Sequence, residues 1–485
     1  MERTPIVEIK DLVGQTVDLF GWVHTRRDHG KLIFIDIRDR SGMAQVVFTP
    51  DNKNIHELAS QLRSEWVIHL KGKVNARPDK MVNADIPTGK VEIEPVELKI
   101  LNKSETPPFP IDTDGKEIGE EHRMKYRYLD LRRERMLKNM TMRHKVIKFI
   151  RDHLSNAGFL EIETPVLTKS TPEGARDYVV PSRLYSGSFY ALPQSPQQYK
   201  QLLMVAGLEK YFKIARCFRA EDTRGDRQPE FTQLDLEMSF VNREDVMALN
   251  EELLIKIVTE LTPEKKIQTL PFPRITYKDA MAKYGTDRPD LRKINPSTDG
   301  DPNLLAFCWV IDFPFFSAES SEEHSGGPAT MSQNRTLGGE KWTFTHNPFS
   351  RATPEHEEAL SKGEGIGEIL TTQYDVALNG FEIGGGSIRN HKPEMLKQVF
   401  KILGYSDERI EANFGHMLKA LGSGAPPHGG IAWGLDRLVT LLAGEPNIRE
   451  VIAFPKTGEG RDLMMNAPSE IEAKQLKELG IKIGK

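Results

Sequence analysis

Cysteine, long apolar runs and an excess of charge are all scarce in this sequence of 485 residues. Its two cysteines, Cys217 and Cys308, cannot build a disulfide framework or a cysteine-based zinc site within one chain. No run of about 18 apolar residues predicts a membrane span, and the N-terminus lacks the apolar region of a signal peptide. The 66 basic and 70 acidic residues nearly cancel, which argues against a histone-like basic binder. We therefore expect a soluble, cytoplasmic protein with no membrane partner.

Several common nucleotide and metal motifs are also missing. The sequence has no G-x-x-x-x-G-K-[ST] loop, no G-x-G-x-x-G fingerprint after a strand and no H-E-x-x-H motif. Any use of ATP must therefore depend on a site other than a P-loop. The length exceeds the size at which one core stops growing, and 38% hydrophobic residues suffice for more than one core. Two or three domains are expected.

The first domain is expected at residues 1–105. Five segments rich in Val, Ile and Phe are separated by Gly, Asp or Pro, and a helical segment lies between the third and the fourth. This order is typical of a five-stranded barrel of the OB type. The strands are expected at 17–23, 31–39, 44–49, 66–74 and 91–100, and the helix at 55–62. A proline cluster then opens a hinge, expected at 106–135.

The second domain is expected at residues 136–485. Val146, Ile150 and Leu154 recur with a helical period, and Gly158 fits the end of that helix. Strands are expected at 159–163, 211–219, 231–240, 380–389 and 429–435, and further helices at 243–261, 355–362 and 436–443. A hairpin-length loop joins two of these strands, so the pattern predicts an α+β domain with an antiparallel sheet flanked by helices. The Ser/Gly/Glu-rich segment 317–340 is expected to be a mobile surface loop.

One strand of this domain carries a polar face. Gln233, Asp235 and Glu237 alternate with apolar residues and therefore share one side of the strand. A solvated sheet face would explain this pattern equally well. The preceding loop, 221–230, adds charges of both signs and follows Arg219, whose guanidinium can bind a carboxylate or phosphate with two hydrogen bonds. The loop shifts the balance towards a binding site.

Two glycine-rich segments add to the candidate site. Three consecutive glycines within 381–389 indicate the close approach of a ligand or another backbone, and Glu382 could hold Mg²⁺ with Asp375. Segment 429–437 runs from a glycine-rich strand into a helix, and Arg437 adds a cation near the helix N-terminus, which itself attracts anions. A purely structural glycine turn remains the alternative for this second segment.

Together these segments resemble the three signature motifs of the class II aminoacyl-tRNA synthetases. Residues 159–165 resemble the first motif, 218–237 the second and 434–437 the third. Segments at 170–176, 194–197, 227–235 and 346–349 are similar to the bacterial-type aspartyl-tRNA synthetase family, and segments at 21–28 and 34–39 to its OB anticodon-binding domain. Two departures stand out. The domain that bacterial members usually carry as an insertion is reduced to a short link near 292–305, and Asn347 replaces a second histidine.

The resemblance implies ATP-dependent attachment of L-aspartate to tRNA(Asp) through an aspartyl-adenylate, by a homodimer that uses Mg²⁺. It places the catalytic roles on Arg219, Glu382 and Arg437, and the metal on Asp375 and Glu382. The implied ATP-binding residues are Arg219, Ala220, Glu221, Gln228, Glu382, Gly434, Leu435, Asp436 and Arg437. The implied aspartate-binding residues are Glu173, Ser195, Gln197, Lys200, Arg219, Asp235, His346 and Arg389. Two fixed cations among them, Lys200 and Arg389, favour an anionic side chain over a neutral amide.

The expected barrel carries an aromatic residue on a polar strand face. Phe34 shares that face with Asp36 and Arg38, which fits stacking on an unpaired base, although a stray surface aromatic is the alternative. The expected anticodon-binding residues are Arg26, Arg27, His29, Phe34, Gln45 and Lys80.

Which tRNAs are charged is less settled by the sequence. His29 stands at a position where family members that charge both tRNA(Asp) and tRNA(Asn) tend to carry histidine, whereas members that charge tRNA(Asp) alone tend to carry leucine. Lys80 supports this less, since the members that charge both tRNAs tend to have glycine near that position. A non-discriminating enzyme is therefore the hypothesis, with a strictly tRNA(Asp)-specific enzyme as the alternative. A tRNA-independent amino-acid ligase is less favoured because such relatives lack the barrel. A non-catalytic paralogue is disfavoured because Arg219, Glu382 and Arg437 are all present.

Overall fold

The computed structural model describes residues 3–170, 174–294, 300–318 and 342–484. Contacts between residues divide the chain into two compact units, Met1–Leu137 and Lys138–Lys485. The segment 106–135, expected as a hinge, lies within the first unit. The segment 317–340 falls almost entirely outside the described residues, as does the middle of the expected link 292–305.

The first unit contains a closed five-stranded barrel, which confirms the expected OB-type fold. Neighbouring strands are antiparallel except for β3 and β5, and the strand order is β1-β2-β3-β5-β4. The barrel elements are β1 (Thr16–His29), β2 (Leu32–Arg38), β3 (Met43–Phe48), α1 (Lys53–Gln61), β4 (Val67–Ala76) and β5 (Val91–Asn102), with 3₁₀ turns at Ile6–Asp11 and Asp79–Met81. Buried Val, Leu, Ile and Phe side chains from every strand fill its centre. Short helices α2 (Glu120–Lys125) and α3 (Arg127–Asp130) follow before α4 (Glu134–Asn156) begins.

The second unit is built on an eight-stranded sheet in the order β12-β14-β17-β18-β19-β10-β9-β6. Its strands are β6 (Leu160–Glu161), β9 (Lys210–Phe218), β10 (Glu230–Ser239), β12 (Arg274–Thr276), β14 (Phe307–Ile311), β17 (Tyr374–Leu378), β18 (Phe381–Ile388) and β19 (His428–Gly434). The inner pairings are antiparallel, but both edge strands, β6 and β12, pair in parallel. The strand expected at 159–163 shrinks to two paired residues, because the chain leaves the sheet edge before Pro165.

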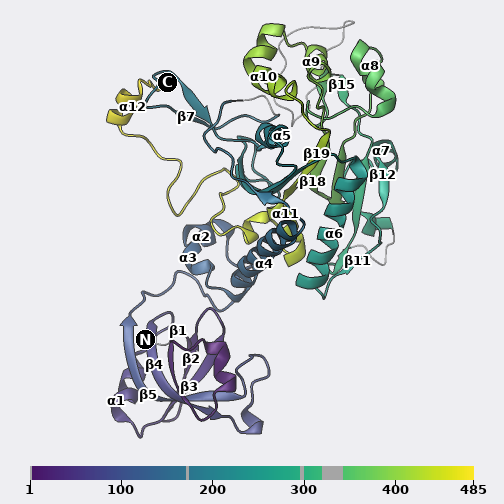
Figure 1. The fold of residues 1–485 in the computed structure, drawn as a ribbon. Helices are drawn as coiled ribbons and strands as arrows, with labels where there is room; N and C mark the ends of the chain where they lie inside the picture. Colours follow the sequence, from purple (N-terminus) through teal and green to yellow (C-terminus); the bar gives the residue numbers. More distant parts are fainter. Residues whose placement is uncertain (1–2, 171–173, 295–299, 319–341, 485) are drawn as a thin grey trace. The chain divides into compact units, whose positions relative to one another are not determined.

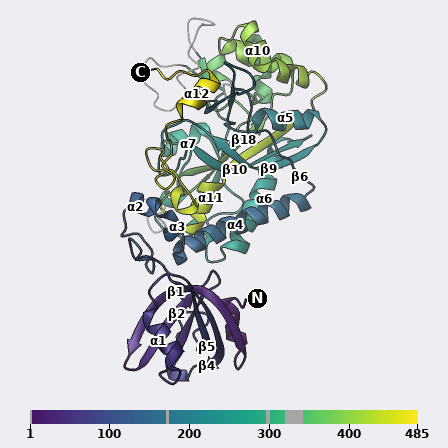
Figure 2. The same ribbon diagram turned by 90° about the vertical axis from the view of Figure 1, so that its left-hand side faces the viewer.

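Helices cover one face of this sheet (Figures 1 and 2). Apolar side chains of α4, α6 (Arg243–Leu261) and α11 (Leu435–Ala443) pack on the inward residues of the central strands to form the largest core. Helix α6 begins at a capping box in which Asn242 and Asp245 satisfy each other's backbone N–H groups. The opposite sheet face is therefore available for the polar side chains of β10.

Smaller elements complete the second unit. The remaining helices are α5 (Gln197–Val205), α7 (Tyr277–Tyr284), α8 (Glu357–Lys362), α9 (Pro393–Ile402), α10 (Asp407–Leu421) and α12 (Ala473–Leu479), with 3₁₀ turns at Leu291–Ile294, Pro354–His356, Ile366–Glu368 and Ile448–Val451. Three two-stranded sheets pair β7 (Val179–Pro181) with β8 (Phe189–Ala191), β11 (Lys266–Ile267) with β13 (Leu304–Leu305), and β15 (Phe316–Ala318) with β16 (Trp342–Phe344). The helix expected at 355–362 is a 3₁₀ turn followed by α8. Within the described residues, no helix is long and apolar enough to cross a membrane.

Candidate active site

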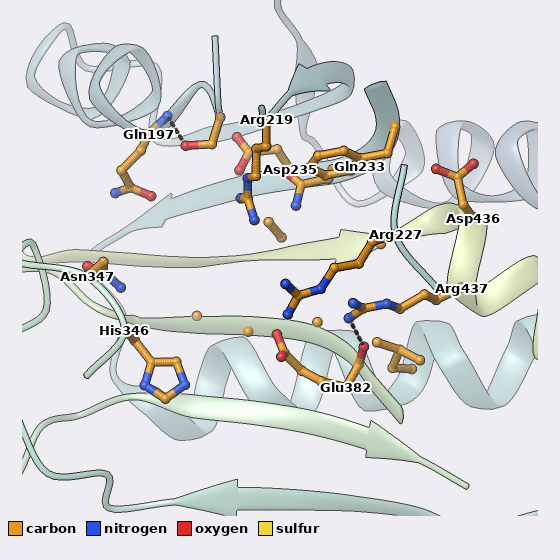
Figure 3. Close-up of a pocket in the computed structure, with 18 of the residues that line it drawn as sticks. Gln197, Arg219, Arg227, Gln233, Asp235, His346, Asn347, Glu382, Asp436 and Arg437 are labelled. Atoms are coloured by element: carbon orange, nitrogen blue, oxygen red, sulfur yellow. Dashed lines mark hydrogen bonds between the residues drawn. The ribbon is translucent and has the colours of Figure 1, made fainter. Parts of the chain in front are cut away.

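A cavity of about 360 Å³ opens over the polar face of the sheet. Its walls come from β10, β18 and β19, from the loop between β9 and β10, and from the segment 346–349 (Figure 3). The cavity contains polar and charged side chains from positions far apart in the sequence, including Ser195, Gln197, Lys200, Arg219, Glu221, Arg227, Gln228, Gln233, Asp235, His346, Asn347, Glu382, Arg389, Asp436 and Arg437. Most of the predicted site residues are thus brought together.

Strand register explains why acidic side chains meet here. Asp235 is opposite Ala432, Ala432 is opposite Gly385, and Gly385 is opposite Asp375, so these residues form a row across four strands. Directly opposite residues share a face. A Cβ on Gly385 would lie 2.6 Å from Asp375 Oδ1, so the glycine makes room for that carboxylate. A Cβ on Gly430 would clash with the Leu236 carbonyl and with the Glu237 carboxylate.

A β-bulge sets the direction of Glu382. The pairing of β17 with β18 shifts between Val376 and Ala377, which leaves Ile383 as the extra residue. Glu382 and Gly385 are three positions apart and would face opposite sides of a regular strand. The extra residue restores both to the cavity side, where the Glu382 carboxylate projects (Figure 3).

Four charged side chains form what we call the buried ion cluster: Lys200, Asp235, Glu237 and Arg389. Lys200 Nζ lies 2.6 Å from Asp235 Oδ1 and 3.2 Å from Glu237 Oε2. Arg389 donates to both oxygens of Glu237, at 2.9 and 3.1 Å, and also to Ser387 Oγ and the Gly430 carbonyl. The side chains are only 0–3% exposed. Two positive and two negative charges thus compensate each other inside the protein.

Burial and charge oppose each other in this cluster. Burial would raise the pKa of Glu237, but the Arg389 guanidinium and the Lys200 ammonium hold that pKa below its ordinary value. Burial raises the pKa of Asp235 despite the nearby Lys200. Glu237 is therefore the firmly ionised partner that keeps Arg389 in place.

Arginines dominate the other end of the cavity. The Arg219 guanidinium stacks over Phe231 at 5.1 Å from the ring centre. Arg227 lies 3.6 Å from Glu221, and Arg437 donates to the Glu382 carbonyl at 2.8 Å and pairs with Asp226. Such a group of guanidiniums suits a polyphosphate.

Two predicted ATP-binding side chains already have protein partners. Gln228 Oε1 accepts from the Lys456 backbone N–H at 2.7 Å. Asp436 accepts from Arg143 and from the Thr232 backbone N–H, so it ties α11 to α4 and β10. Both residues line the cavity and shape its wall.

Asp375 and His346 form a hydrogen-bonded pair beside Glu382. His346 Nε2 lies 3.1 Å from Asp375 Oδ2, and Gln373 donates to Asp375 Oδ1 at 2.7 Å. Burial would lower the pKa of His346, but the Asp375 carboxylate raises it to about 9. Burial and the charge of Asp375 raise the pKa of Glu382, against the effect of Arg437.

The carboxylates fit the metal that the sequence suggested. Mg²⁺ prefers oxygen ligands and is commonly bound by one or two carboxylates together with substrate phosphates. The Glu382 carboxylate faces the cavity (Figure 3). Asp375 lies on the neighbouring strand β17, is buried and does not line the cavity, but its charge acts on Glu382. Among the described residues, no group of three or more His, Cys, Asp or Glu side chains could hold a metal ion. A metal here would therefore need substrate phosphates as further ligands.

Some predicted residues lie elsewhere, and some neighbours were missed. Glu173 lies outside the described residues, and Leu435 is fully buried in the core. Three predicted residues are not among those that line the cavity: Ala220, Asp375 and Leu435. Sequence reasoning placed Glu237 on the polar face of its strand without giving it a role. Its partner Arg389 is 152 residues away, so no local pattern could reveal the pair.

The barrel face brings together four of the six predicted anticodon residues. Phe34 is opposite Arg27 in the β1–β2 register, and His29 meets the Phe34 ring edge-on at 5.9 Å. Arg27 reaches Asp36 at 2.9 Å and Gln45 at 3.5 Å. Arg26 alternates to the other strand face, where it binds Asp28 and the Ser60 carbonyl. Lys80 is exposed in the 3₁₀ turn between β4 and β5.

Comparisons with known proteins agree with this architecture. A family model described as tRNA synthetases class II (D, K and N) matches residues 119–458, and one described as OB-fold nucleic acid binding domain matches residues 17–101. The chain is 42% identical to the aspartate–tRNA(Asp/Asn) ligase of Desulfatibacillum aliphaticivorans, over 98% of this chain and 96% of that protein. It is 40% identical to the aspartate–tRNA ligase of Staphylococcus carnosus, over 98% of both chains.

Solved structures share the fold. An asparaginyl-tRNA synthetase from Pyrococcus horikoshii, complexed with asparaginyl-adenylate, has a TM-score of 0.73 at 23% identity and covers 94% of this chain and 98% of its own. The alignment to the Desulfatibacillum protein extends over 581 positions although this chain has 485 residues, so roughly a hundred positions of that relative have no counterpart here.

Proposed function

This chain belongs to the class II tRNA synthetases (D, K and N), and we propose that it attaches L-aspartate to tRNA with the consumption of ATP. Aminoacyl-tRNA synthetases use ATP as a substrate. The observation that carries the choice of aspartate is the buried ion cluster, because it fixes two cations, Lys200 and Arg389, in the wall of the cavity. The charges of the cluster compensate each other, but each cation keeps one N–H that is not directed at a partner among the described residues. A substrate carboxylate can accept from both N–H groups, whereas a neutral amide also presents its own donors to them.

The first step joins aspartate to ATP. An α-carboxylate oxygen of aspartate attacks the α-phosphorus, the bond from that phosphorus to the bridging oxygen breaks, and pyrophosphate leaves with the electron pair. Arg219 stands between the two ends of the cavity and stabilises negative charge on the α-phosphate (Figure 3). Arg437 and Arg227 bind the remaining phosphates, and Glu221 and Gln228 the adenosine side.

The other lining residues orient the amino acid. Gln197 has a buried amide nitrogen without a hydrogen-bond partner in the described part of the chain, so it can donate to the substrate. Asp235 and Ser195 line the same cavity and would accept from the α-ammonium. Glu382 with Asp375 would hold Mg²⁺, which supplies positive charge against the phosphates when bound.

The second step transfers the aspartyl group to tRNA. A hydroxyl of the terminal ribose attacks the carbonyl carbon of the adenylate, and AMP leaves. The barrel face formed by Arg27, His29, Phe34 and Gln45 reads the anticodon through stacking and hydrogen bonds. Because His29 can donate to more than one base, we propose that tRNA(Asn) is charged as well as tRNA(Asp).

A homodimer in the cytoplasm is part of the same proposal. In β6 and in the segment after it, the chain exposes apolar side chains at Leu160, Val166 and Leu167, which are 44–52% exposed. An isologous interface between two copies would cover them. The domain limits 1–105, 106–135 and 136–485, with the short link near 292–305 in place of an inserted domain, also remain proposals.

Aminoacylation of transcripts tests the proposed function directly. The enzyme is offered aspartate, asparagine or lysine with tRNA(Asp) or tRNA(Asn), and we expect aspartate alone to be attached, to both tRNAs. A kcat/KM for tRNA(Asn) more than about a thousandfold below that for tRNA(Asp), roughly 4 kcal/mol, would instead mean a discriminating enzyme. His29→Leu is the matched variant, and it should lower charging of tRNA(Asn) far more than that of tRNA(Asp).

A further inference from the structure

Asn347 lies in the wall of the cavity, in the segment that follows His346 (Figure 3). Backbone hydrogen bonds fix this segment against the end of β18. The Asn390 N–H donates to the Phe349 carbonyl and the Arg351 N–H to the Ile388 carbonyl, both at 2.8 Å. Asn347 is therefore held at the same end of the cavity as Arg389.

The orientation of the Asn347 amide is set by its own backbone. Its Oδ1 accepts from the Phe349 N–H at 3.0 Å, which closes a turn of the Asx type. A backbone N–H can only donate, so the atom that faces it must be the oxygen and cannot be the amide nitrogen. Ser350 Oγ lies 3.4 Å from the same oxygen, but its nearest acceptor for its single proton is Ser387 Oγ at 2.8 Å. The Asn347 nitrogen is thereby turned towards the cavity (Figure 3).

A count of donors shows what the buried ion cluster leaves for a substrate. Of the three N–H groups of Lys200, two are directed at Asp235 and Glu237. Of the five of Arg389, two are directed at Glu237, one at Ser387 and one at Gly430. One N–H remains on each cation, whereas a carboxylate can accept about four hydrogen bonds. The two N–H groups of the Asn347 amide raise the number of donors available to a substrate carboxylate from two to four.

We propose that Asn347 is a specificity-determining residue, which presents only donors to the substrate side chain and so selects a carboxylate over an amide. This inference rests on the proposed function and deepens it. Asparagine has one acceptor and one NH₂ group on its side chain. Against the donors of Lys200, Arg389 and Asn347, either orientation of that amide places its NH₂ group against another N–H. Aspartate meets no such conflict.

The test is a change that keeps the turn and reverses the polarity towards the cavity. In Asn347→Asp, one carboxylate oxygen still accepts from the Phe349 N–H, but the second faces the substrate. Pyrophosphate exchange with aspartate or asparagine gives kcat/KM for each. We expect the aspartate-to-asparagine ratio to fall at least about a hundredfold, because like charges then oppose each other. Asn347→Ser, which keeps an oxygen for the turn but has no amide nitrogen, should lower the ratio about tenfold.

Asn242→Asp is the matched control. Asn242 also accepts from a backbone N–H two residues ahead, at 2.8 Å, but at the start of α6 and outside the cavity. In Asn242→Asp, the aspartate-to-asparagine ratio of kcat/KM should stay within about threefold of the wild-type ratio. A ratio unchanged in both Asn347 variants, whether activity is kept or lost equally for the two amino acids, would overturn the inference. A wild-type protein without aspartate-dependent exchange would instead overturn the proposed function.

Discussion

The two candidate binding surfaces of this molecule hold their charges in opposite ways. In the cavity of the second unit, the side chains of the buried ion cluster are at most 3% exposed, and each has a partner of opposite charge. On the barrel face, the Arg27 side chain is 51% exposed, although it pairs with Asp36 at 2.9 Å. Buried charges cannot exchange a lost partner for water, whereas exposed ones can.

This contrast separates a rigid site from an adaptable one. In the cavity the cations are positioned before any substrate arrives, so binding costs little reorganisation. On the barrel face, an aromatic ring and hydrated charges can accommodate more than one base. The contrast predicts large effects of single substitutions in the cavity and small, salt-dependent effects on the barrel.

The largest effect is expected for Glu237→Ala. It leaves Arg389 and Lys200 buried with one carboxylate between them, so the free energy of unfolding should fall by about 3–5 kcal/mol. Denaturant unfolding followed by tryptophan fluorescence measures this loss. Glu230→Ala, on the same strand, is the control, since Glu230 is 34% exposed and pairs with Arg216. It should cost less than about 1 kcal/mol. An equal loss of unfolding free energy in the two variants would contradict the contrast between buried and exposed charges.

Arg219→Ala should act on chemistry with little effect on stability. The guanidinium packs over Phe231 and faces the cavity, where it would meet charge that develops on the α-phosphate. Aspartate-dependent pyrophosphate exchange should fall at least about a hundredfold. Arg219→Lys keeps the charge but not the planar pair of donors, and should be intermediate. Exchange near the wild-type rate in Arg219→Ala would refute the assigned role.

Phe34→Ala should weaken tRNA use without changing amino-acid activation. One lost base stack is worth about 1–3 kcal/mol, so KM for tRNA should rise about tenfold. Pyrophosphate exchange without tRNA should remain at the wild-type level, because the ring lies in the other unit. Phe34→Tyr keeps the stacking surface and should retain most of the affinity. A Phe34→Ala enzyme with unchanged KM for tRNA would remove Phe34 from the anticodon site.

The smallest effect is expected for Arg27→Ala. Its ion pair is exposed, so stability should change by less than about 1 kcal/mol. If Arg27 contacts a phosphate, the slope of log affinity for tRNA against log salt should become shallower by about one. Arg26→Ala makes the same charge change on the opposite strand face and should leave the slope closer to that of the wild type. Identical salt slopes in Arg27→Ala and Arg26→Ala would mean that tRNA binding does not distinguish the two faces of the strand.

Much of the fold could be predicted from local pattern. Alternation of apolar and polar residues located the barrel strands and the long central strands of the sheet, and the helix expected at 243–261 has the bounds of α6. Short elements were harder. The strand expected at 159–163 pairs over only two residues, because it is an edge strand whose length depends on where the chain leaves its single neighbour, β9.

The candidate site could be predicted in part. Arg219, Glu382 and Arg437 stand in segments whose composition is unusual enough to be noticed, and all three line one cavity. The direction of Glu382 could not be predicted, because it depends on a bulge in the pairing with β17. The role of Glu237 could not be predicted either, because its partners lie on α5 and just beyond β18.

The sequence by itself determined the kinds of elements, their approximate order and the chemical groups available to the site, because these depend on residue type and on spacing along the chain. The tertiary structure decided which charges neutralise each other, which glycines make room for carboxylates and which way the Asn347 amide points. These features depend on strand register and on contacts between residues far apart in the chain. A local pattern carries no record of such contacts, since the same alternation is compatible with many partners across the sheet.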